Sequence, residues 1–467
     1  MIVTRHRFDD LVAARSVAVI GASQDPARIG GRPVRFLREG GFTGAIYPIN
    51  AKYAEVQGLR CYPDLASVPG PVDVAIVSVP ARDVAAAVAA CGAGGVKAAI
   101  VYSSGFGEVG AGGRVLQDEI ARLARETGVR VLGPNCQGVA AFHQGLNLSF
   151  SSAFIEQGEP GPVGLVVQSG AVGGMMASLL RERGVNFSYW ISSGNEADID
   201  VAECVDFLAR DRHTRVIGAY VESVRDGGRL RDAVATARAA GKPVVILRAG
   251  RSAQSARAAA SHTGAVASED RAMTALLADA GATDARDVQE LLDDVYAFAR
   301  VERPCGRRIA ILSNSGGLGV IMADTCARLG LEVPALPERA QASLRAFLPG
   351  FGAAGNPVDV TAQALSDPSL LPRSLEVLLH AGDIDVVVVA LAMVNRMNPV
   401  DRIVGDLLRT QDGAGKPVMV AWVASAPEGA EAIDAAGLAV FTDATRCLGA
   451  LAALSVTPGA ARPPAPR

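Results

Sequence analysis

The sequence predicts an α/β protein made of three units, each built on a parallel β-sheet. Short runs of Val, Ile and Ala alternate with Ala- and Arg-rich amphipathic stretches, which is typical of β–α–β units. Turns that contain glycine separate the two kinds of stretch, and the chain holds 51 glycines. Its 467 residues suffice for three domains, since a domain takes about 150 residues.

The first unit, residues 1–145, is predicted to be a Rossmann-like open sheet. Apolar runs predict strands over 16–20, 45–49, 72–79, 98–102 and 129–132. Amphipathic stretches between them predict helices over 34–39, 81–91 and 114–126. Residues 141–162 show no helical period and end in a Gly- and Pro-rich stretch, so we expect a link between domains there.

Two further units follow that show the same alternation of apolar runs and amphipathic stretches. The second, 160–302, has strands expected over 163–168, 187–192, 216–221 and 244–248, and helices near 269–279 and 288–301. After a break at 303–306, the third unit, 306–456, has strands expected over 308–313, 386–391, 418–423 and 439–441. The Pro-, Ala- and Arg-rich tail, 457–467, is expected to be disordered.

Composition argues against several classes of protein. Hydrophobic residues make up 49 % of the chain, and the net charge of −3 argues against broad binding to nucleic acid or anionic membranes. The longest apolar run, 386–394, is too short to span a membrane and suits a buried strand. The first ten residues lack the apolar region of a signal peptide. Seven scattered cysteines without metal-ligand spacing predict no metal site and a reducing cytoplasm.

Two strand-to-helix turns have the composition of phosphate-binding sites. They are Ser169-Gly170-Ala171, which opens the second unit, and Ser315-Gly316-Gly317, which opens the third. A helix that starts at such a turn directs free N–H groups and the positive end of its dipole toward one point. The alternative is that small residues only allow a tight turn, but two matched turns in one chain favour phosphate binding.

A third turn, Gly21-Ala22-Ser23, ends the first strand and is typical of nucleotide-binding folds, although it is not GxGxxG. A dinucleotide site requires an acidic residue at the end of the second strand to bind the ribose, but Asn50 and Lys52 stand there. This argues against an NAD-dependent oxidoreductase. Lys52 suits a ligand with an extra phosphate near the ribose, as coenzyme A (CoA) and NADP have; the alternative is a solvated surface lysine.

Small and polar residues also follow the remaining strands of the first unit. They are Val79 and Pro80 after the third strand, Ser104 after the fourth, and Asn135 and Cys136 after the fifth. Because ligands bind at the carboxyl edge of open α/β sheets, we expect these residues to line a site. Cys136 is either a reactive thiol or, as a tight turn favours, a buried and inert one.

His262 is the candidate nucleophile among five histidines. It lies in the small-residue loop 260–265, where a substrate can reach it. A nucleophilic imidazole needs an acceptor on its other nitrogen, usually a carboxylate. Glu222, at the end of the strand 216–221, can supply it. On this pattern alone, a structural histidine remains an alternative.

These motifs resemble those of the α-type subunits of NDP-forming acyl-CoA synthetases, a family that includes ADP-forming acetate–CoA ligase and, more distantly, succinyl-CoA synthetase. The resemblance extends to about residue 456, and the motifs occur in the order of the family. The matching stretches are VAVIGAS (17–23), YPINAKY (47–53), VSVPA (77–81), SSGFGE (103–108), GPNCQG (133–138), VVQSGAVG (166–173), SSGNEADID (192–200), YVES (220–223), SHTGA (261–265), SNSGGLG (313–319) and NPVDV (356–360).

The resemblance implies a Rossmann-like CoA-binding domain followed by two flavodoxin-like domains. CoA would lie with its nucleotide phosphates near Gly21, Ala22, Ser23 and Lys52, and with its pantetheine arm and thiol along Val79, Pro80, Ser104, Asn135 and Cys136. His262 matches the phosphorylated histidine of the family, and Glu222 matches the acid that orients it. The turns at Ser169 and Ser315 match the two helix ends that hold the phosphoryl group.

The implied reaction is ADP-forming acid–CoA ligation. ATP phosphorylates His262, a small carboxylic acid takes the phosphoryl group to give an acyl phosphate, and CoA displaces phosphate to give acyl-CoA. Three units use up the 467 residues, so ATP/ADP and Mg are expected on a separate ATP-grasp partner in a hetero-oligomer. Gln137 and residues 140–142 depart from the family pattern beside the expected acyl pocket, which leaves the acid open. The alternative is a non-catalytic CoA or acyl-CoA sensor with the same fold.

Overall fold

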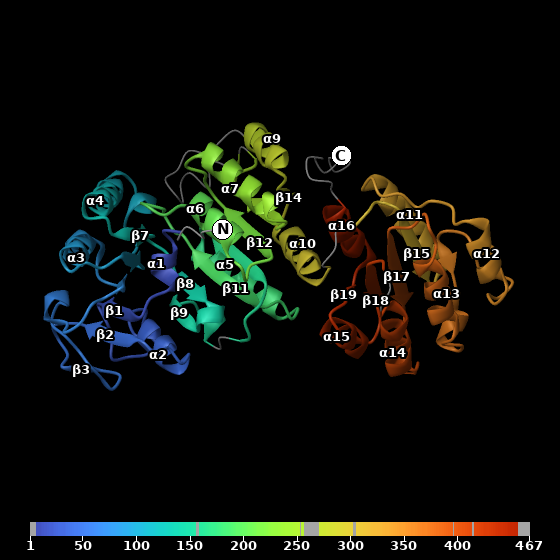
Figure 1. Ribbon diagram of the computed structural model, residues 1–467, viewed down its shortest axis with the longest axis horizontal. Coiled ribbons are helices and arrows are strands. Elements are labelled where there is room, and N and C mark those ends of the chain that lie inside the picture. The colour runs from blue at the N-terminus through green and yellow to red at the C-terminus, as the bar shows by residue number, and fades with distance from the viewer. Residues whose placement is uncertain are drawn as a thin grey trace. The chain divides into compact units, whose positions relative to one another are not determined.

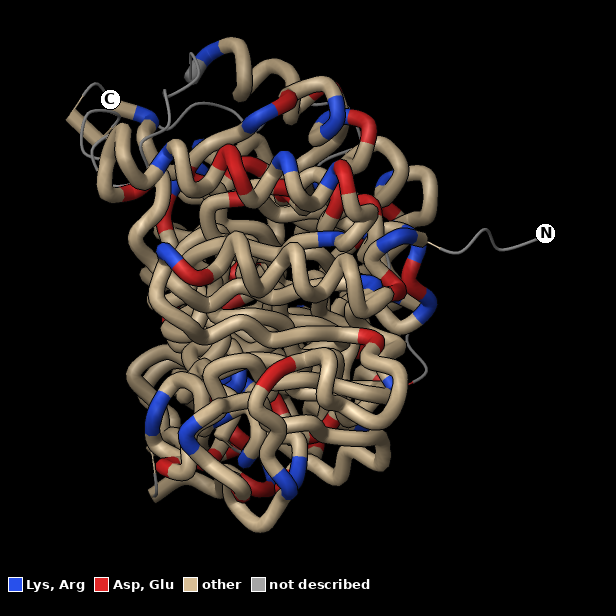
Figure 2. Tube along the Cα trace, turned by 90° about the vertical axis from the view of Figure 1, so that its left-hand side faces the viewer, with Lys and Arg blue, Asp and Glu red and all other residues tan. Residues whose placement is uncertain are grey.

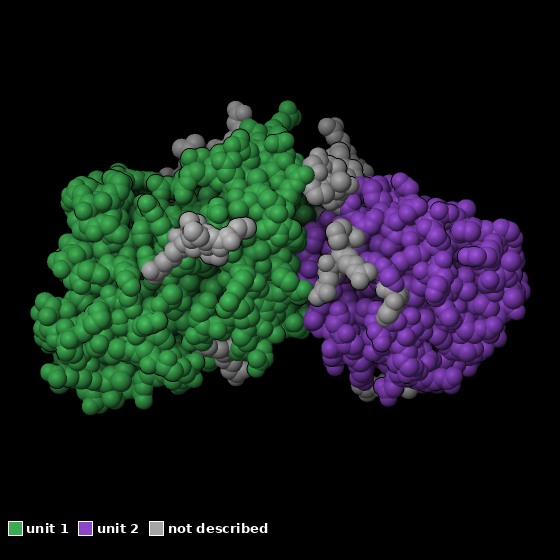
Figure 3. Space-filling view, in the orientation of Figure 1, with its two compact units in different colours: residues 1–288 green, residues 289–467 purple. Residues whose placement is uncertain are grey.

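The computed structural model describes residues 6–155, 158–252, 254–255, 270–301, 305–395, 397–412 and 415–455. The chain forms two compact units, residues 1–288 and residues 289–467 (Figure 3). Three larger sheets, two in the first unit and one in the second, confirm the predicted α/β class (Figure 1). None of the helices within the described residues has the length and apolar character of a bilayer-spanning segment.

The first sheet contains five parallel strands in the order β2-β1-β5-β6-β7. Its strands are β1 (Ser16–Ile20), β2 (Ala45–Ile49), β5 (Val74–Val77), β6 (Ala98–Val101) and β7 (Arg130–Leu132). The accompanying helices are α1 (Asp9–Val12), α2 (Arg32–Glu39), α3 (Ala81–Ala93) and α4 (Ala111–Thr127). A small hairpin, β3 (Glu55–Val56) and β4 (Leu59–Arg60), follows β2.

Alternate residues along the strands of the first sheet point to opposite faces and pack into two different hydrophobic cores. Ala18, on one face of β1, packs with residues of α3 and α4. Val17 and Val19, on the other face, pack with α2 and with a larger core that continues into the second sheet. Both faces of a parallel sheet are buried, which explains the nearly unbroken apolar sequence of these strands.

The second sheet has seven strands in the order β14-β13-β12-β10-β11-β8-β9. Its strands are β8 (Gly138–Ala141), β9 (Leu146–Ser149), β10 (Val163–Val167), β11 (Phe187–Ser192), β12 (Val216–Val221), β13 (Val244–Arg248) and β14 (Thr283–Ala285). Its helices are α5 (Gly170–Arg181), α6 (Val201–Arg210), α7 (Gly227–Ala239) and α9 (Asp270–Ala280).

The hairpin β8–β9 makes this sheet mixed rather than wholly parallel, because β8 pairs antiparallel with β11 and with β9. The segment 141–162, expected as a link, therefore contributes strand β9 to the sheet. Strand β9 is only four residues long, too short for its alternation of apolar and polar residues to stand out in the sequence. The hairpin brings the turn 133–138 of the first sheet next to β11 of the second.

The second unit contains a five-stranded parallel sheet in the order β16-β15-β17-β18-β19. Its strands are β15 (Ile309–Ser313), β16 (Val358–Asp359), β17 (Val386–Ala392), β18 (Val418–Val423) and β19 (Ala439–Phe441). Its helices are α10 (Val288–Arg300), α11 (Gly316–Arg328), α12 (Glu338–Arg345), α13 (Leu370–Leu379), α14 (Val400–Gln411), α15 (Pro427–Ala435) and α16 (Ala444–Leu454). Tyr296 ties α10 to α15 by donating to Oδ1 of Asp434 at 2.7 Å.

Acidic and basic positions are interspersed over the face shown in Figure 2. A mixed surface of this kind agrees with the net charge of −3, and it offers no single-signed field over that face to attract a polyanion.

Candidate functional site

The first candidate site lies at the carboxyl edge of the first sheet, where β1 stands between β2 and β5. Gly21 has φ +87°, and a Cβ at this position would lie 2.2 Å from the carbonyl oxygen of Ser78. Asn50 joins the turn to the end of β2, because its Nδ2 donates to the oxygen of Ala22 at 2.9 Å and its Oδ1 accepts from the nitrogen of Lys52 at 3.0 Å. The structure therefore brings the predicted turn and Lys52 together at a topological switch point, a usual ligand position.

Residues after β5 and β6 continue this edge. Ser103 Oγ donates to the oxygen of Val79 at 2.5 Å, and a Cβ on Gly105 would lie 3.2 Å from the Cβ of Ala81. Pro80 and Ser104 are exposed, and Ser23 is half-buried. The predicted residues thus follow neighbouring strands and leave exposed positions for an extended ligand.

Cys136, in the turn between β7 and β8, is 2 % exposed. Burial raises the pKa of its thiol to about 12, and its Sγ lies 3.4 Å from the oxygen of Val101. A thiol in this state is not a nucleophile at neutral pH. The surroundings of Cys136 favour the buried, inert alternative over a reactive thiol.

A network of side-chain amides and one carboxylate joins three of the matching stretches, 103–108, 133–138 and 192–200. Asn195, after β11, donates through Nδ2 to Oε2 of Glu108 at 2.5 Å and to Oε1 of Gln117 at 3.1 Å. Its Oδ1 accepts from Nδ2 of Asn135 at 3.2 Å. Burial alone would raise the pKa of Glu108, but hydrogen bonds from the nitrogen of Gly105 and from Asn195 outweigh it and lower the pKa. The carboxyl edges of the first and second sheets are therefore joined through ionised Glu108.

The second candidate site is the N-terminus of α5. Ser169 is the N-cap residue, but among the described residues its hydroxyl caps no N–H of the helix. The nitrogen of Gly173 donates to the oxygen of Ser169 at 2.9 Å. The N–H groups of the first turn, which include those of Gly170 and Ala171, precede the first intrahelical donor and face the N-terminal end of the helix. This arrangement suits an anion.

Glu222 lies beside this turn because β12 is the neighbour of β10. Gln168, the residue before the turn, accepts through Oε1 from the nitrogen of Glu222 at 2.5 Å and from the nitrogen of Ser223 at 2.9 Å. Burial, followed by the charge of Glu222, raises the pKa of Tyr220 to about 12. His262 and the rest of 256–269 lie outside the described residues, so the predicted pairing of His262 with Glu222 stays a prediction.

Glu196 is a candidate that sequence reasoning did not single out. It is 3 % exposed, has φ +57° and accepts through Oε1 from Nε2 of Gln168 and Oγ of Ser193, each at 2.8 Å. Burial raises its pKa to about 7. Its place within the matched stretch 192–200 was the available signal, but its contact with Gln168 depends on the pairing of β10 with β11.

The N-terminus of α11 differs from that of α5. Ser315 caps its helix by accepting from the nitrogen of Leu318 at 3.4 Å. A Cβ on Gly316 would lie 2.7 Å from Oδ2 of Asp359, so a carboxylate already stands over this turn. Nothing lies within 4 Å of the Cβ position of Gly317 among the described residues. The two predicted phosphate turns therefore have different electrostatic surroundings.

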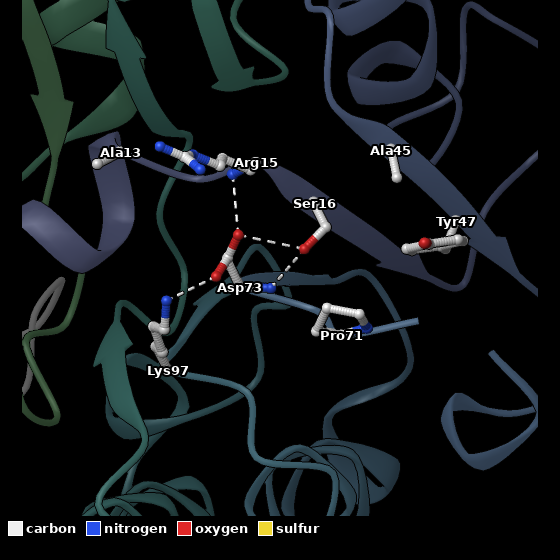
Figure 4. A pocket seen from close by; sticks show the side chains of 8 residues that line it. All are labelled: Ala13, Arg15, Ser16, Ala45, Tyr47, Pro71, Asp73 and Lys97. Carbon is white, nitrogen blue, oxygen red and sulfur yellow. Dashed lines mark hydrogen bonds and ion pairs between the residues drawn. The ribbon is translucent and has the colours of Figure 1, made fainter. Parts of the chain in front are cut away.

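A cavity of about 670 Å³ lies at the opposite, amino edge of the first sheet. Asp73 occupies it and accepts from Nζ of Lys97 at 2.7 Å, the nitrogen of Arg15 at 2.9 Å and Oγ of Ser16 at 3.2 Å (Figure 4). Because Lys97 neutralises Asp73 and the other two donors are a main-chain nitrogen and a hydroxyl, we attribute a structural role to the cluster. In the part of the chain that the structure describes, no group of three His, Cys, Asp or Glu side chains is arranged to hold a metal ion.

Three family descriptions match consecutive parts of the chain. A CoA binding domain matches residues 15–141, a succinyl-CoA ligase like flavodoxin domain matches residues 160–298, and a Ligase-CoA domain matches residues 309–436.

Individual relatives agree over most of the length. The α subunit of acetate–CoA ligase [ADP-forming] II from Pyrococcus furiosus is 36% identical over 414 residues, 88% of this chain and 88% of the relative. The α subunit of acetate–CoA ligase [ADP-forming] I from the same organism is 34% identical over 96% of this chain and 97% of the relative. A solved structure of dinucleotide forming acetyl-coenzyme A synthetase 1 from Ca. Korarchaeum cryptofilum, in complex with phosphate and ADP, matches with a TM-score of 0.88, 33% identity and 96% coverage of both chains.

A CoA-binding domain followed by two ligase-type α/β domains defines an NDP-forming acyl-CoA synthetase of the α type. Within that class, the chain belongs to the family of the α subunits of ADP-forming acetate–CoA ligases. Membership favours the catalytic interpretation, an acid–thiol ligase, over a non-catalytic CoA sensor.

Proposed function

We propose that this chain catalyses the phosphoryl- and acyl-transfer steps by which a small carboxylic acid, CoA and ATP give acyl-CoA, ADP and phosphate. The uncapped N-terminus of α5, tied to Glu222 through Gln168, is the observation that carries the proposal. Helix-end N–H groups stabilise the charge that develops on a transferring phosphoryl group without reorganisation.

In the first proposed step, a ring nitrogen of His262 attacks the terminal phosphorus of ATP, the P–O bond to ADP breaks and ADP leaves, with Glu222 orienting the imidazole. A carboxylate oxygen of the acid then attacks phosphorus, the P–N bond breaks and the acyl phosphate forms. Finally, the CoA sulfur attacks the acyl carbon, the C–O bond breaks, and phosphate leaves with the proton of the thiol. The turn at Ser169, Gly170 and Ala171 holds the phosphoryl oxygens in these steps.

The proposed CoA site runs along the carboxyl edge of the first sheet. Gly21, Ala22, Ser23 and Lys52 would contact the nucleotide phosphates, and Val79, Pro80, Ser104, Asn135 and Cys136 would lie along the pantetheine arm. The proximity of the first turn to Lys52, through Asn50, supports the phosphate end. The network that joins Asn135 to Asn195 supports delivery of the thiol toward the second sheet.

We assign ATP/ADP and Mg²⁺ to an ATP-grasp partner chain. The α-subunit names of two relatives imply a hetero-oligomer. Acetate–CoA ligase [ADP-forming] I from Archaeoglobus fulgidus matches over 96% of this chain but only 63% of its own length, which leaves room there for the ATP-binding part. We propose that Ser315, Gly316 and Gly317 form the second phosphate turn. The nearby carboxylate of Asp359 would repel a bound anion there.

The substrate is proposed to be a small carboxylic acid, and the compartment the cytoplasm. Relatives are named for acetate, and others carry the names trans-feruloyl-CoA synthase and 4-hydroxybutyrate–CoA ligase, so the acid varies within the family. All seven cysteines are free and buried, which supports a reducing compartment.

Labelled orthophosphate and acetyl-CoA test the proposal without ATP or a partner. Run in reverse, the two transfer steps should place acid-labile phosphate on the purified chain. His262→Ala should abolish the label, and the control His380→Ala should retain it, since His380 is exposed and its Nδ1 lies 2.8 Å from the oxygen of Glu376 in the preceding turn. Label that persists in His262→Ala contradicts the role of His262. CoA binding without any labelling, even with an ATP-grasp partner and ATP, would establish the sensor instead.

A further inference from the structure

The segment that follows β11 of the second sheet runs along β7, the last strand of the first sheet. Three main-chain hydrogen bonds join the two: Ile199 N to Val131 O at 3.1 Å, Ala197 N to Gly133 O at 2.8 Å and Asn195 N to Pro134 O at 2.9 Å. Gly194 allows this approach, because it has φ +61° and a Cβ on it would lie 2.4 Å from the oxygen of Pro134. The second sheet is therefore attached where the first sheet carries the proposed thiol end of the CoA site.

The side chain of Asn195 contacts that thiol end directly. Its Oδ1 accepts from Nδ2 of Asn135 at 3.2 Å, and its Nδ2 donates to Oε2 of Glu108 at 2.5 Å. Asn135 has φ +56°, a left-handed conformation that surrounding contacts must maintain. Glu108 in turn accepts through Oε1 from the nitrogen of Gly105 at 2.6 Å. One amide thus fixes the turns after β6 and β7 relative to each other and to the second sheet.

The next residue, Glu196, contacts the proposed phosphoryl site. Its Oε1 accepts from Nε2 of Gln168, the residue before Ser169, at 2.8 Å. Its main-chain oxygen accepts from Nη1 of Arg225, three residues after Glu222. Two adjacent residues therefore connect the proposed thiol end of the CoA site with the two segments that form the proposed phosphoryl site.

We propose that Asn195 is a positioning residue for the thioester step, in which it acts through Asn135 and Glu108 to place the CoA sulfur against the acyl phosphate at the α5 turn. This inference rests on the proposed function, because it assigns a residue to one step of it. Reacting atoms must come within about 3–3.5 Å, and a misplacement of about 1 Å can slow a reaction about a hundredfold. The nucleotide end of the CoA site is at β1 and β2, and β5 and β6 separate β1 from β7. Asn195 therefore affects where the thiol lies more than whether CoA binds.

Two labelled phosphate donors separate the steps. Acetyl phosphate labels His262 directly, because the imidazole nitrogen attacks phosphorus, the P–O bond breaks and acetate leaves. Orthophosphate must first react with acetyl-CoA. There a phosphate oxygen attacks the acyl carbon, the C–S bond breaks, and the sulfur takes the proton of the phosphate. Only this second route depends on where the CoA sulfur lies.

Asn195→Ala should slow labelling by orthophosphate and acetyl-CoA about tenfold or more. Labelling by acetyl phosphate, and the affinity for CoA in calorimetry, should change by no more than about twofold. The control Gln144→Ala should leave all three measurements unchanged, because Gln144 is exposed and its Nε2 donates to Tyr189 Oη at 2.6 Å. If Asn195→Ala fails to fold, Asn195→Ser takes its place.

Equal slowing with both donors would show that Asn195 is a general structural residue, and unchanged labelling with both would show that it has no role. A tenfold loss of CoA affinity would place Asn195 in the binding site rather than beside it. Each of these results overturns the proposal and leaves the proposed function standing. An unmodified chain that takes label from neither donor would instead remove the proposed function, and the role of Asn195 with it.

Discussion

Gln168 joins the buried carboxylate of Glu196 to the main chain of the Glu222 loop. Its Nε2 donates to Oε1 of Glu196 at 2.8 Å and to the oxygen of Ser223 at 2.7 Å, while its Oε1 accepts from the nitrogens of Glu222 and Ser223. One side chain thus connects the ends of three adjacent strands, β11, β10 and β12. The helix turn that follows Gln168 is fixed relative to the proposed acid of the phosphohistidine site.

Replacing Gln168 should disrupt this connection. Gln168→Leu removes the side-chain acceptor of the Glu222 and Ser223 nitrogens and one of the donors to Glu196, which keeps its bonds from Ser193 and Val201. Each lost bond to a buried group costs about 1–3 kcal/mol. We expect a lower midpoint of urea unfolding and slower labelling by orthophosphate. CoA binding should be retained, because the first sheet keeps its contacts. Gln144→Leu is the matched control, and a similar loss in both variants would contradict a special role for Gln168.

Glu196 should make stability depend on pH near neutrality. Burial, reinforced by the nearby charge of Asp200, raises its pKa from 4.5 to about 7. The folded protein therefore holds a proton that the unfolded chain has lost between these values. Stability from this group is present below pH 4.5 and decreases as pH rises toward 7, by roughly 3 kcal/mol. Urea unfolding of Glu196→Gln should show the variant gaining stability relative to the unmodified chain between pH 5 and 8. A difference that does not change with pH would show that Glu196 stays ionised.

Lys52 should recognise the phosphate that distinguishes CoA from dephospho-CoA. Lys52→Ala should weaken CoA binding about tenfold and dephospho-CoA binding by no more than about twofold, since one charged hydrogen bond is lost only with CoA. Lys97→Ala is the control, because Lys97 lies at the amino edge and pairs with Asp73. Equal effects of Lys52→Ala on both ligands would remove it from the phosphate site and leave the solvated-lysine alternative.

The sequence predicted the central strands well because they are continuous apolar runs that are buried on both faces. The range 16–20 matches β1, and 216–221 matches β12. Edge strands such as β16, Val358–Asp359, escaped prediction because two residues carry no periodicity and their pairing partner is distant in sequence. The strand-to-helix turns could be predicted for the same reason as the central strands: each directly follows one.

What lies above those turns could not be predicted from local pattern. The carboxylate of Asp359 reaches Gly316 across a strand pairing, and the amide of Gln137 reaches Gly170 through the β8–β9 hairpin, which itself was not expected. Glu196 likewise depends on Gln168, 28 residues earlier in the chain. Chemistry at a sheet edge is assembled from separate strands, so sequence identified the edge but not these cross-strand contacts.

Asp73 should stabilise the amino edge of the first sheet except in acid. Burial would raise its pKa, but the bond from Lys97, together with those from Arg15 and Ser16, outweighs burial and lowers the pKa. Its contribution is present above its unfolded pKa, near 4, and is lost as pH falls through the lower folded value. Asp73→Asn should lower the free energy of unfolding by about 1 kcal/mol at pH 7 and by much less at pH 3. An equal loss at both pH values would contradict an ionic contribution.

Asp359 should limit anion binding at the α11 turn. Its Oδ1 accepts from the nitrogen of Thr361 at 2.8 Å, which holds the carboxylate in place, while Oδ2 faces Gly316. A carboxylate near a bound phosphate opposes it by on the order of 1 kcal/mol or more. Asp359→Asn keeps the shape of the side chain and removes its charge. In calorimetry with orthophosphate, the affinity of the second phosphate site, at the α11 turn, should therefore rise by about tenfold. The control Asp367→Asn removes an exposed carboxylate of the same unit that accepts from Ser369 at 3.1 Å. If both variants bind phosphate alike, net charge rather than the position of Asp359 governs anion binding.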